Sequence, residues 1–149
     1  MPLSVPVVRL DPDLPVPSYA RRGDAGIDLY ARCDATLEPG GGRRLVPTGI
    51  RIAVPPGHAG LVLPRSGLAL DHGVTLVNSP GLIDAAYRGE VKVVLINTDP
   101  VETYHVRRGD RVAQLVVQRV DEVAWDVVDA LDRCDLGGDR GGGFGHSGR

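Results

Sequence analysis

One short segment, residues 81–91, carries side chains that suit a hydrolytic reaction. Asp84 follows an apolar pair, the aromatic ring of Tyr87 comes three residues later, and Arg88-Gly89 precedes an alternating run. Alternation of apolar and polar residues predicts a strand, so the segment predicts a tight hairpin. An aspartate at the mouth of that hairpin, beside an exposed ring, predicts a general base next to a stacking surface. In the alternative interpretation Asp84 bonds turn amides and Tyr87 covers the core.

Four further segments contain residue types that bind phosphate, a metal ion or water. They are 25–31 with Asp28, 64–69 with Arg65, Ser66 and Gly67, 109–115 with Arg111 and Gln114, and a glycine-rich tail over 137–148.

The segment around Arg65 predicts an anion site. A hydroxyl and a guanidinium stand at the expected start of a short helix, where backbone amides point outward. A guanidinium can also bind an anion through two hydrogen bonds. The alternative is that Ser66 simply caps the helix.

In order and in rough spacing, these five segments resemble the motifs of the trimeric deoxyuridine triphosphatases (dUTPases). The resemblance runs from about residue 20 to the end, and Asn78-Ser79-Pro80 also fits it. It implies a homotrimer with shared active sites that uses Mg²⁺ to hydrolyse dUTP to dUMP and pyrophosphate. Such an enzyme keeps uracil out of DNA and supplies dUMP for thymidylate synthesis.

The resemblance also implies a role for each polar residue of the motifs. Asp84 orients and deprotonates the water that attacks the α-phosphorus, and Gln114 helps to hold that water. Asp28 meets Mg²⁺ through coordinated water, which suits an ion that keeps several waters; the alternative is an ordinary strand-end carboxylate. For Arg111 two roles stay open, phosphate binding and a structural ion pair.

Base and sugar selection are also implied by the resemblance. The hairpin backbone reads the uracil edge, and Asn78 supplies a side-chain amide. A tight backbone pocket leaves no room for a methyl group at C5, and Tyr87 lies against the sugar and resists a 2′-hydroxyl. Both exclusions are steric, so selectivity comes from clash as much as from attraction.

The tail departs from the family pattern by one residue. Counted back from Phe144, the family arginine falls on Asp139, and Arg140 follows it. By resemblance Phe144 stacks on uracil, Arg140 reaches the γ-phosphate, and His146 and Ser147 stand where small hydroxyl residues bind phosphate. The alternative is a disordered, solubilising tail.

Two other functions are compatible with parts of this pattern. Deoxycytidine triphosphate deaminases share the fold and similar motifs, but they carry a catalytic glutamate where this chain has Val94, and they lack the phenylalanine-bearing arm. A non-catalytic nucleotide-sensing module would tolerate loss of Asp84 or Gln114, and both are present.

Composition predicts an all-β fold. The chain has 149 residues with 20 glycines and 12 prolines, which separate short apolar runs. This pattern is typical of a jelly-roll-like β-barrel or sandwich, here over residues 1–136, followed by a flexible arm over 137–149. Strands are expected at 5–10, 27–31, 43–55, 58–64, 73–78, 90–97, 111–120 and 124–128, with one helical turn at 66–71.

Charge and residue usage exclude several classes of protein. A net charge of −2 argues against a nonspecific nucleic-acid binder. Cys33 and Cys134 are isolated and are expected to be free thiols, and the four histidines lie far apart without zinc-ligand spacing. Since no long apolar run or signal pattern occurs, a soluble, cytoplasmic protein without a membrane partner is expected.

Overall fold

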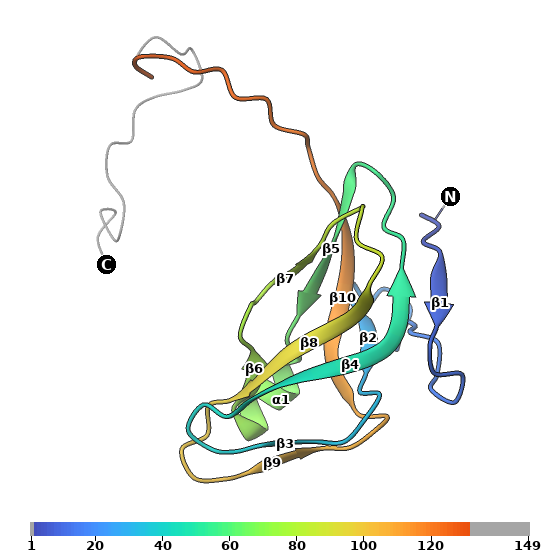
Figure 1. The fold of residues 1–149 in the computed structure, drawn as a ribbon, viewed down its shortest axis with the longest axis vertical. Coiled ribbons are helices and arrows are strands. Elements are labelled where there is room, and N and C mark those ends of the chain that lie inside the picture. Colours follow the sequence, from blue (N-terminus) through green and yellow to red (C-terminus); the bar gives the residue numbers. More distant parts are fainter. Residues whose placement is uncertain (1, 132–149) are drawn as a thin grey trace.

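The computed structural model describes residues 2–131, which form antiparallel β-sheets with one short helix (Figure 1). Two four-stranded sheets, in the orders β1-β4-β8-β6 and β2-β10-β5-β7, are joined by the two-stranded sheet β3-β9. The strands are β1 (Val7–Arg9), β2 (Ile27–Tyr30), β3 (Ala35–Leu37), β4 (Arg43–Ile52), β5 (His58–Leu63), β6 (Val74–Leu76), β7 (Gly81–Ile83), β8 (Glu90–Asn97), β9 (Tyr104–Val106) and β10 (Arg111–Arg119). The predicted all-β, jelly-roll-like sandwich is confirmed.

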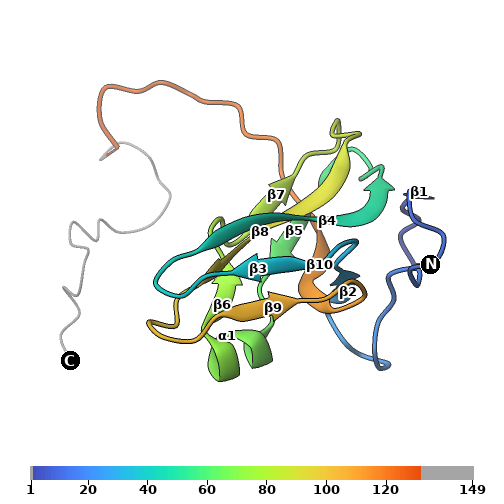
Figure 2. The same ribbon diagram turned by 60° about the horizontal axis from the view of Figure 1, so that its bottom comes forward.

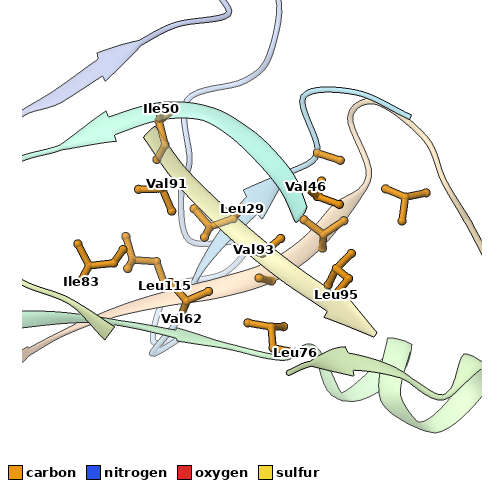
Figure 3. Packing of buried hydrophobic residues seen from close by; sticks show 14 of the residues in the cluster. Leu29, Val46, Ile50, Val62, Leu76, Ile83, Val91, Val93, Leu95 and Leu115 are labelled. Carbon is orange, nitrogen blue, oxygen red and sulfur yellow. The ribbon is translucent and has the colours of Figure 1, made fainter. Parts of the chain in front are cut away.

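The core lies between the two four-stranded sheets and is built from aliphatic side chains. Along β8 the exposed fractions of Val91, Val93 and Leu95 are 2%, 1% and 0%, while Lys92 between them is exposed. Figure 3 shows these three side chains packed with residues of the opposite sheet, among them Leu29 of β2 and Leu115 of β10. The period of two in the sequence therefore separates a buried face from an outer face, as predicted.

Most predicted strands are confirmed, with ends that differ by at most three residues. Two short strands, β3 and β9, were not predicted; they lie side by side at the bottom of Figure 1 and come to the front in Figure 2. Each has three residues, which is too short to show a period in the sequence.

The prediction of a strand at 124–128 is wrong. Residues 120–131 run away from the sandwich without regular structure (Figure 1). Val123, Trp125 and Val127 are 66%, 88% and 93% exposed. Their alternation suits a strand, but within residues 2–131 no other strand lies beside them, and an unpaired strand is not stable in water.

The predicted hairpin over residues 81–91 is also wrong. β7 pairs with β5, while β8 pairs with β4 and β6, so the two arms belong to different sheets. The turn that carries Asp84 and Tyr87 therefore crosses from one sheet to the other.

The helix α1 (Ser66–His72) confirms the predicted helical turn. Its N-cap residue is Arg65, in extended conformation and without a side-chain capping bond, so the alternative of Ser66 as the cap is wrong. Gly73 ends the helix at φ 63°, a left-handed conformation that favours glycine. Across residues 2–131, no helix has the length and apolar character that a membrane span requires.

Candidate functional site

Asp28 lies at the centre of a small ionic cluster. Its side chain is almost buried and accepts hydrogen bonds from two guanidinium groups, Arg65 Nε to Oδ1 at 3.2 Å and Arg111 Nη1 to Oδ2 at 3.3 Å. Arg65 Nη1 also donates to the carbonyl oxygen of Arg111 at 3.3 Å. A buried carboxylate needs such partners, and two cations around one anion leave the cluster with a net positive charge. Arg111 thus forms the structural ion pair that was one of its two predicted roles.

A β-bulge in β10 brings the residues of this cluster to one face. The β10–β2 register shifts between Arg111 and Ala113, and both Val112 and Ala113 are buried. Two successive inward-facing residues leave Arg111 and Gln114 on the same side of the strand. Regular alternation would have placed these two side chains on opposite faces.

Gln114 lies against the segment 25–31, which contains Asp28. It pairs with Asp28 of β2 on one side and with Leu63 of β5 on the other. A Cβ atom at Gly26 would lie 3.1 Å from Cβ of Gln114. Glycine at this position therefore allows the glutamine side chain to sit beside β2.

A polar cavity of about 450 Å³ opens beside the cluster, and we refer to it as the arginine pocket. Burial and the charge of Asp110 raise the pKa of Tyr104 in its wall. Sequence reasoning assigned no role to three of the wall residues: Tyr30 and Asp110 lie inside the segments 25–31 and 109–115, whereas Tyr104 lies outside all five segments. The lining residues are Tyr30, Arg65, Leu68, Tyr104, Gly109, Asp110 and Arg111.

The second part of the site is the turn between β7 and β8. Asp84 is exposed, and within residues 2–131 its carboxylate accepts no hydrogen bond. Tyr87 is 42% exposed, and its hydroxyl donates to the carbonyl oxygen of Glu90 at 2.8 Å. A Cβ atom at Gly89 would collide with the Tyr87 ring, so the ring lies directly on this glycine. The alternative in which Tyr87 covers the core does not match its exposure.

Tyr87 also borders a second cavity, of about 310 Å³, that we refer to as the tyrosine pocket. Its other lining residues are Leu45, Leu82, Ile83, Val91 and Lys92. β7 is the edge strand of its sheet, and β6 pairs with β8 only at residues 95–97. Within residues 2–131, β7 and the start of β8 therefore each have one edge without a strand partner. Asn78 is exposed near this place, with its Nδ2 atom 3.3 Å from where a Cβ of Gly81 would lie.

Within one chain, Asp84 lies apart from the Asp28 cluster. Ile83 pairs with Gly60, so Asp84 lies level with Ala59 on β5, whereas Gln114 pairs with Leu63. Four residues of extended strand span about 13 Å. The sequence-predicted residues therefore form two groups, Asp28, Arg65, Arg111 and Gln114 with the adjoining Ser66 and Gly67, and Asn78, Asp84 and Tyr87.

The tail residues assigned from the sequence, Arg140, Phe144, His146 and Ser147, lie outside the described residues. So do Cys134 and the predicted domain boundary at residues 136 and 137. Cys33 is an exposed, free thiol.

The described residues suit a Mg²⁺ ion only if the substrate brings the ion into the site. In residues 2–131 no three His, Cys, Asp or Glu side chains converge as a metal cage. Asp28 offers carboxylate oxygens, but both already accept from guanidinium groups, which repel a bare cation. Mg²⁺ that keeps its waters and is bound by phosphate oxygens needs only an outer contact of this kind.

The fold and the site define a β-sandwich protein with a carboxylate held between two arginines at a polar pocket. A family model described as dUTPase matches residues 13–148, and the chain belongs to this family. It is 56% identical to a deoxyuridine 5′-triphosphate nucleotidohydrolase of Rhodococcus erythropolis over 98% of this chain and 87% of that protein. It is 57% identical to the protein of that name from Mycobacterium avium, over 98% and 94%.

Solved structures of the same fold come from phages of Staphylococcus. A mutant dUTPase of bacteriophage 80alpha with dUpNHpp has a TM-score of 0.87 at 22% identity, covering 98% of this chain and 99% of that chain. A mutant dUTPase of phage phi11, described with a structural Mg(II) ion, has a TM-score of 0.79 at 22% identity over 87% and 99%. At this identity the likeness concerns the fold alone.

Proposed function

We propose that the protein hydrolyses dUTP to dUMP and pyrophosphate with Mg²⁺. The observation that carries the proposal is the pair Arg65 and Arg111, which flank Asp28 beside the arginine pocket. Two fixed guanidinium groups suit a triphosphate, because phosphate oxygens accept charge-assisted hydrogen bonds. Membership of the dUTPase family and the names of the close relatives support this substrate.

The chemical step follows from an exposed carboxylate. Asp84 takes a proton from a water molecule as the water oxygen forms a bond to the α-phosphorus. The bond from that phosphorus to the bridging oxygen breaks, and pyrophosphate leaves with the electron pair. Gln114 holds the water through its side-chain amide. Because the Asp84 carboxylate is exposed and accepts no hydrogen bond within residues 2–131, it is available to accept this proton.

The phosphates bind at the start of α1. Arg65 and Arg111 stabilise the charge that develops on the phosphate oxygens, while Ser66 and Gly67 add a hydroxyl and a backbone amide. Arg111 then combines both roles expected from the sequence, since one nitrogen bonds Asp28 and its half-exposed guanidinium still faces the pocket.

The nucleoside binds at the tyrosine pocket. The unpaired strand edges of β7 and β8 offer backbone groups to the uracil edge, and the exposed Asn78 adds its amide. The ring of Tyr87 borders the same cavity and contacts the sugar, where it excludes a 2′-hydroxyl.

Mg²⁺, when bound to the triphosphate, neutralises phosphate charge and orients the phosphate chain. Asp28 would hold this ion through the water that the ion keeps. The structural Mg(II) of the phi11 phage dUTPase supports magnesium as the metal of the family.

The active protein is a homotrimer with shared active sites. Two observations support this proposal: Asp84 and Gln114 are separated in one chain, and residues 120–131 leave the sandwich with exposed apolar side chains. A second chain can bring its own Gln114 to Asp84, and apolar surface of this kind is typical of subunit contacts. The tail of a third chain supplies Arg140, Phe144, His146 and Ser147 to the bound nucleotide.

The cell compartment is the cytoplasm, where nucleotides are made and used. No nucleic-acid or membrane partner is proposed, and the net charge of −2 argues against nonspecific binding of nucleic acid.

A nucleotide panel with Mg²⁺ tests the function. Pyrophosphate release is measured with dUTP, dCTP, dTTP and UTP, and the nucleoside products are identified. We expect release from dUTP far above the other three. Binding of dUTP without turnover would instead establish a nucleotide sensor, and ammonia release from dCTP would establish a deaminase.

A further inference from the structure

Glu90 makes two different connections at the end of the turn that carries Tyr87. Its carboxylate oxygen Oε1 accepts a hydrogen bond from the Gly49 backbone N–H at 3.0 Å and one from Arg32 Nη1 at 3.4 Å. Its main-chain carbonyl oxygen accepts the hydroxyl of Tyr87 at 2.8 Å. The Glu90 side chain is only 14% exposed.

The carboxylate of Glu90 fills an irregularity in the neighbouring strand. Regular pairing of β4 with β8 stops at Pro47 and resumes at Arg51, and Gly49 adopts φ 74° between them. Within this interval the buried Thr48 hydroxyl donates to the Val91 carbonyl oxygen at 2.7 Å. Side chains thus replace the missing ladder bonds and fix the start of β8 to β4.

From these contacts we propose that Glu90 is a positioning residue, which holds the Tyr87 ring at the sugar by fixing the backbone to which the ring is bonded. The inference rests on the proposed sugar contact of Tyr87. Without the carboxylate, the carbonyl oxygen of Glu90 moves more freely, and the ring that is bonded to it follows. A displaced ring leaves space for a 2′-hydroxyl, so discrimination between dUTP and UTP falls.

Arg32 extends this anchoring to the N-terminal segment. It donates from Nη2 to the Leu10 carbonyl oxygen at 3.3 Å, and its Nε lies 3.9 Å from Asp11 Oδ2. Asp11 in turn accepts two bonds from Arg108. The base of the turn is therefore connected to a surface ion-pair network that contains none of the residues proposed to touch substrate.

The test is the ratio of kcat/KM for dUTP to kcat/KM for UTP in a double-mutant cycle. We expect Tyr87→Ala to lower the ratio about ten- to two-hundredfold, the usual range for loss of one steric contact. Glu90→Ala is expected to lower it about tenfold, and Tyr87→Phe, which loses only the hydroxyl, by a similar factor. Adding Glu90→Ala to Tyr87→Ala is expected to change the ratio no further, because both act through the same ring.

Two further variants separate positioning from general destabilisation. Glu90→Gln retains an acceptor for the Gly49 N–H, so it is expected to keep more of the selectivity than Glu90→Ala does. Asp99→Ala removes a carboxylate that accepts backbone bonds from Val101 and Glu102 far from the turn. It is expected to lower Tm and leave the ratio unchanged.

The outcomes distinguish this inference from the proposed function. If Tyr87→Ala leaves the ratio unchanged, the sugar contact itself is wrong. If Tyr87→Ala lowers the ratio but Glu90→Ala does not, Glu90 is not a positioning residue. Full additivity of the two substitutions would also overturn the inference, because Glu90 would then act independently of the ring.

Discussion

Asp28 and Gln114 are direct partners across the β2–β10 ladder, so their side chains lie on the same face of the sheet. One is the carboxylate proposed to face the metal–triphosphate complex, and the other is the amide proposed to hold water. Neither depends on a loop for its position, since both stand on paired strands. This part of the site is therefore expected to be rigid before substrate binds.

Asp84→Asn is expected to remove nearly all turnover. The amide keeps the shape of the side chain but cannot accept the proton from water. Affinity for the nucleotide should stay within about tenfold, which corresponds to about 1.4 kcal/mol. Steady-state pyrophosphate release and titration with dUMP measure the two effects. Residual activity within tenfold of the parent would move the role of base to another group.

Complementation between two inactive variants tests the sharing of active sites. Asp84→Asn and Gln114→Ala chains, each inactive alone, are unfolded together and refolded as mixed oligomers. If each site combines Asp84 of one chain with Gln114 of another, random mixing restores about a quarter of the sites. Sites built within one chain would regain no activity. Mixing two batches of the same variant is the matched control, and light scattering reports whether the mixture is trimeric.

The glycine-rich tail is expected to be essential for turnover but not for folding. Truncation before Gly138 should lower kcat by orders of magnitude, because this segment is proposed to cover the bound nucleotide and to exclude bulk water from the phosphates. Tm and oligomeric state should change little. Arg140→Ala is expected to reproduce much of the loss. A truncated chain with low activity beside a fully active Arg140→Ala variant would show that Arg140 does not replace the family arginine.

Asp11 gives a pH-dependent contribution to stability. Partial burial raises the pKa of this carboxyl. Hydrogen bonds from Arg108 and the Asp13 backbone, together with the charges of Arg108 and Arg32, lower the pKa by more, so it lies below its usual 3.8. The charged form therefore stabilises the fold above this pH, and the effect is lost as pH falls through the folded-state pKa. Asp11→Asn should lower Tm at pH 7, with a difference that narrows below pH 3.8. An equal difference at both pH values would contradict the assignment.

The sequence was sufficient for the sandwich because its strands alternate cleanly. β8 was predicted with its bounds, and Ile50, Ile52 and Val54 are buried as the period of two required. Five motifs in family order also indicated the residues of the site. These signals are local, so they say which residues occur together along the chain and which face they share.

The spatial grouping of the site was not predictable, for two physical reasons. A bulge at Val112 turns Arg111 to the face of Gln114, and no residue type marks that irregularity in advance. The sequence on either side of Asp84 predicts a hairpin, but β7 pairs with β5 and β8 pairs with β4, in different sheets. Partner choice depends on contacts distant in sequence, as does the absence of a strand near Trp125.

Lys92 is the only lysine of the chain, and it lies in the wall of the tyrosine pocket. Amine-reactive reagents therefore have two targets, this side chain and the amino terminus. A small fluorescent dye attached at Lys92 would place an optical reporter where the nucleoside is proposed to bind, without introducing a cysteine. The emission of that dye would follow filling and emptying of the pocket in real time, on the same sample whose pyrophosphate release is being recorded.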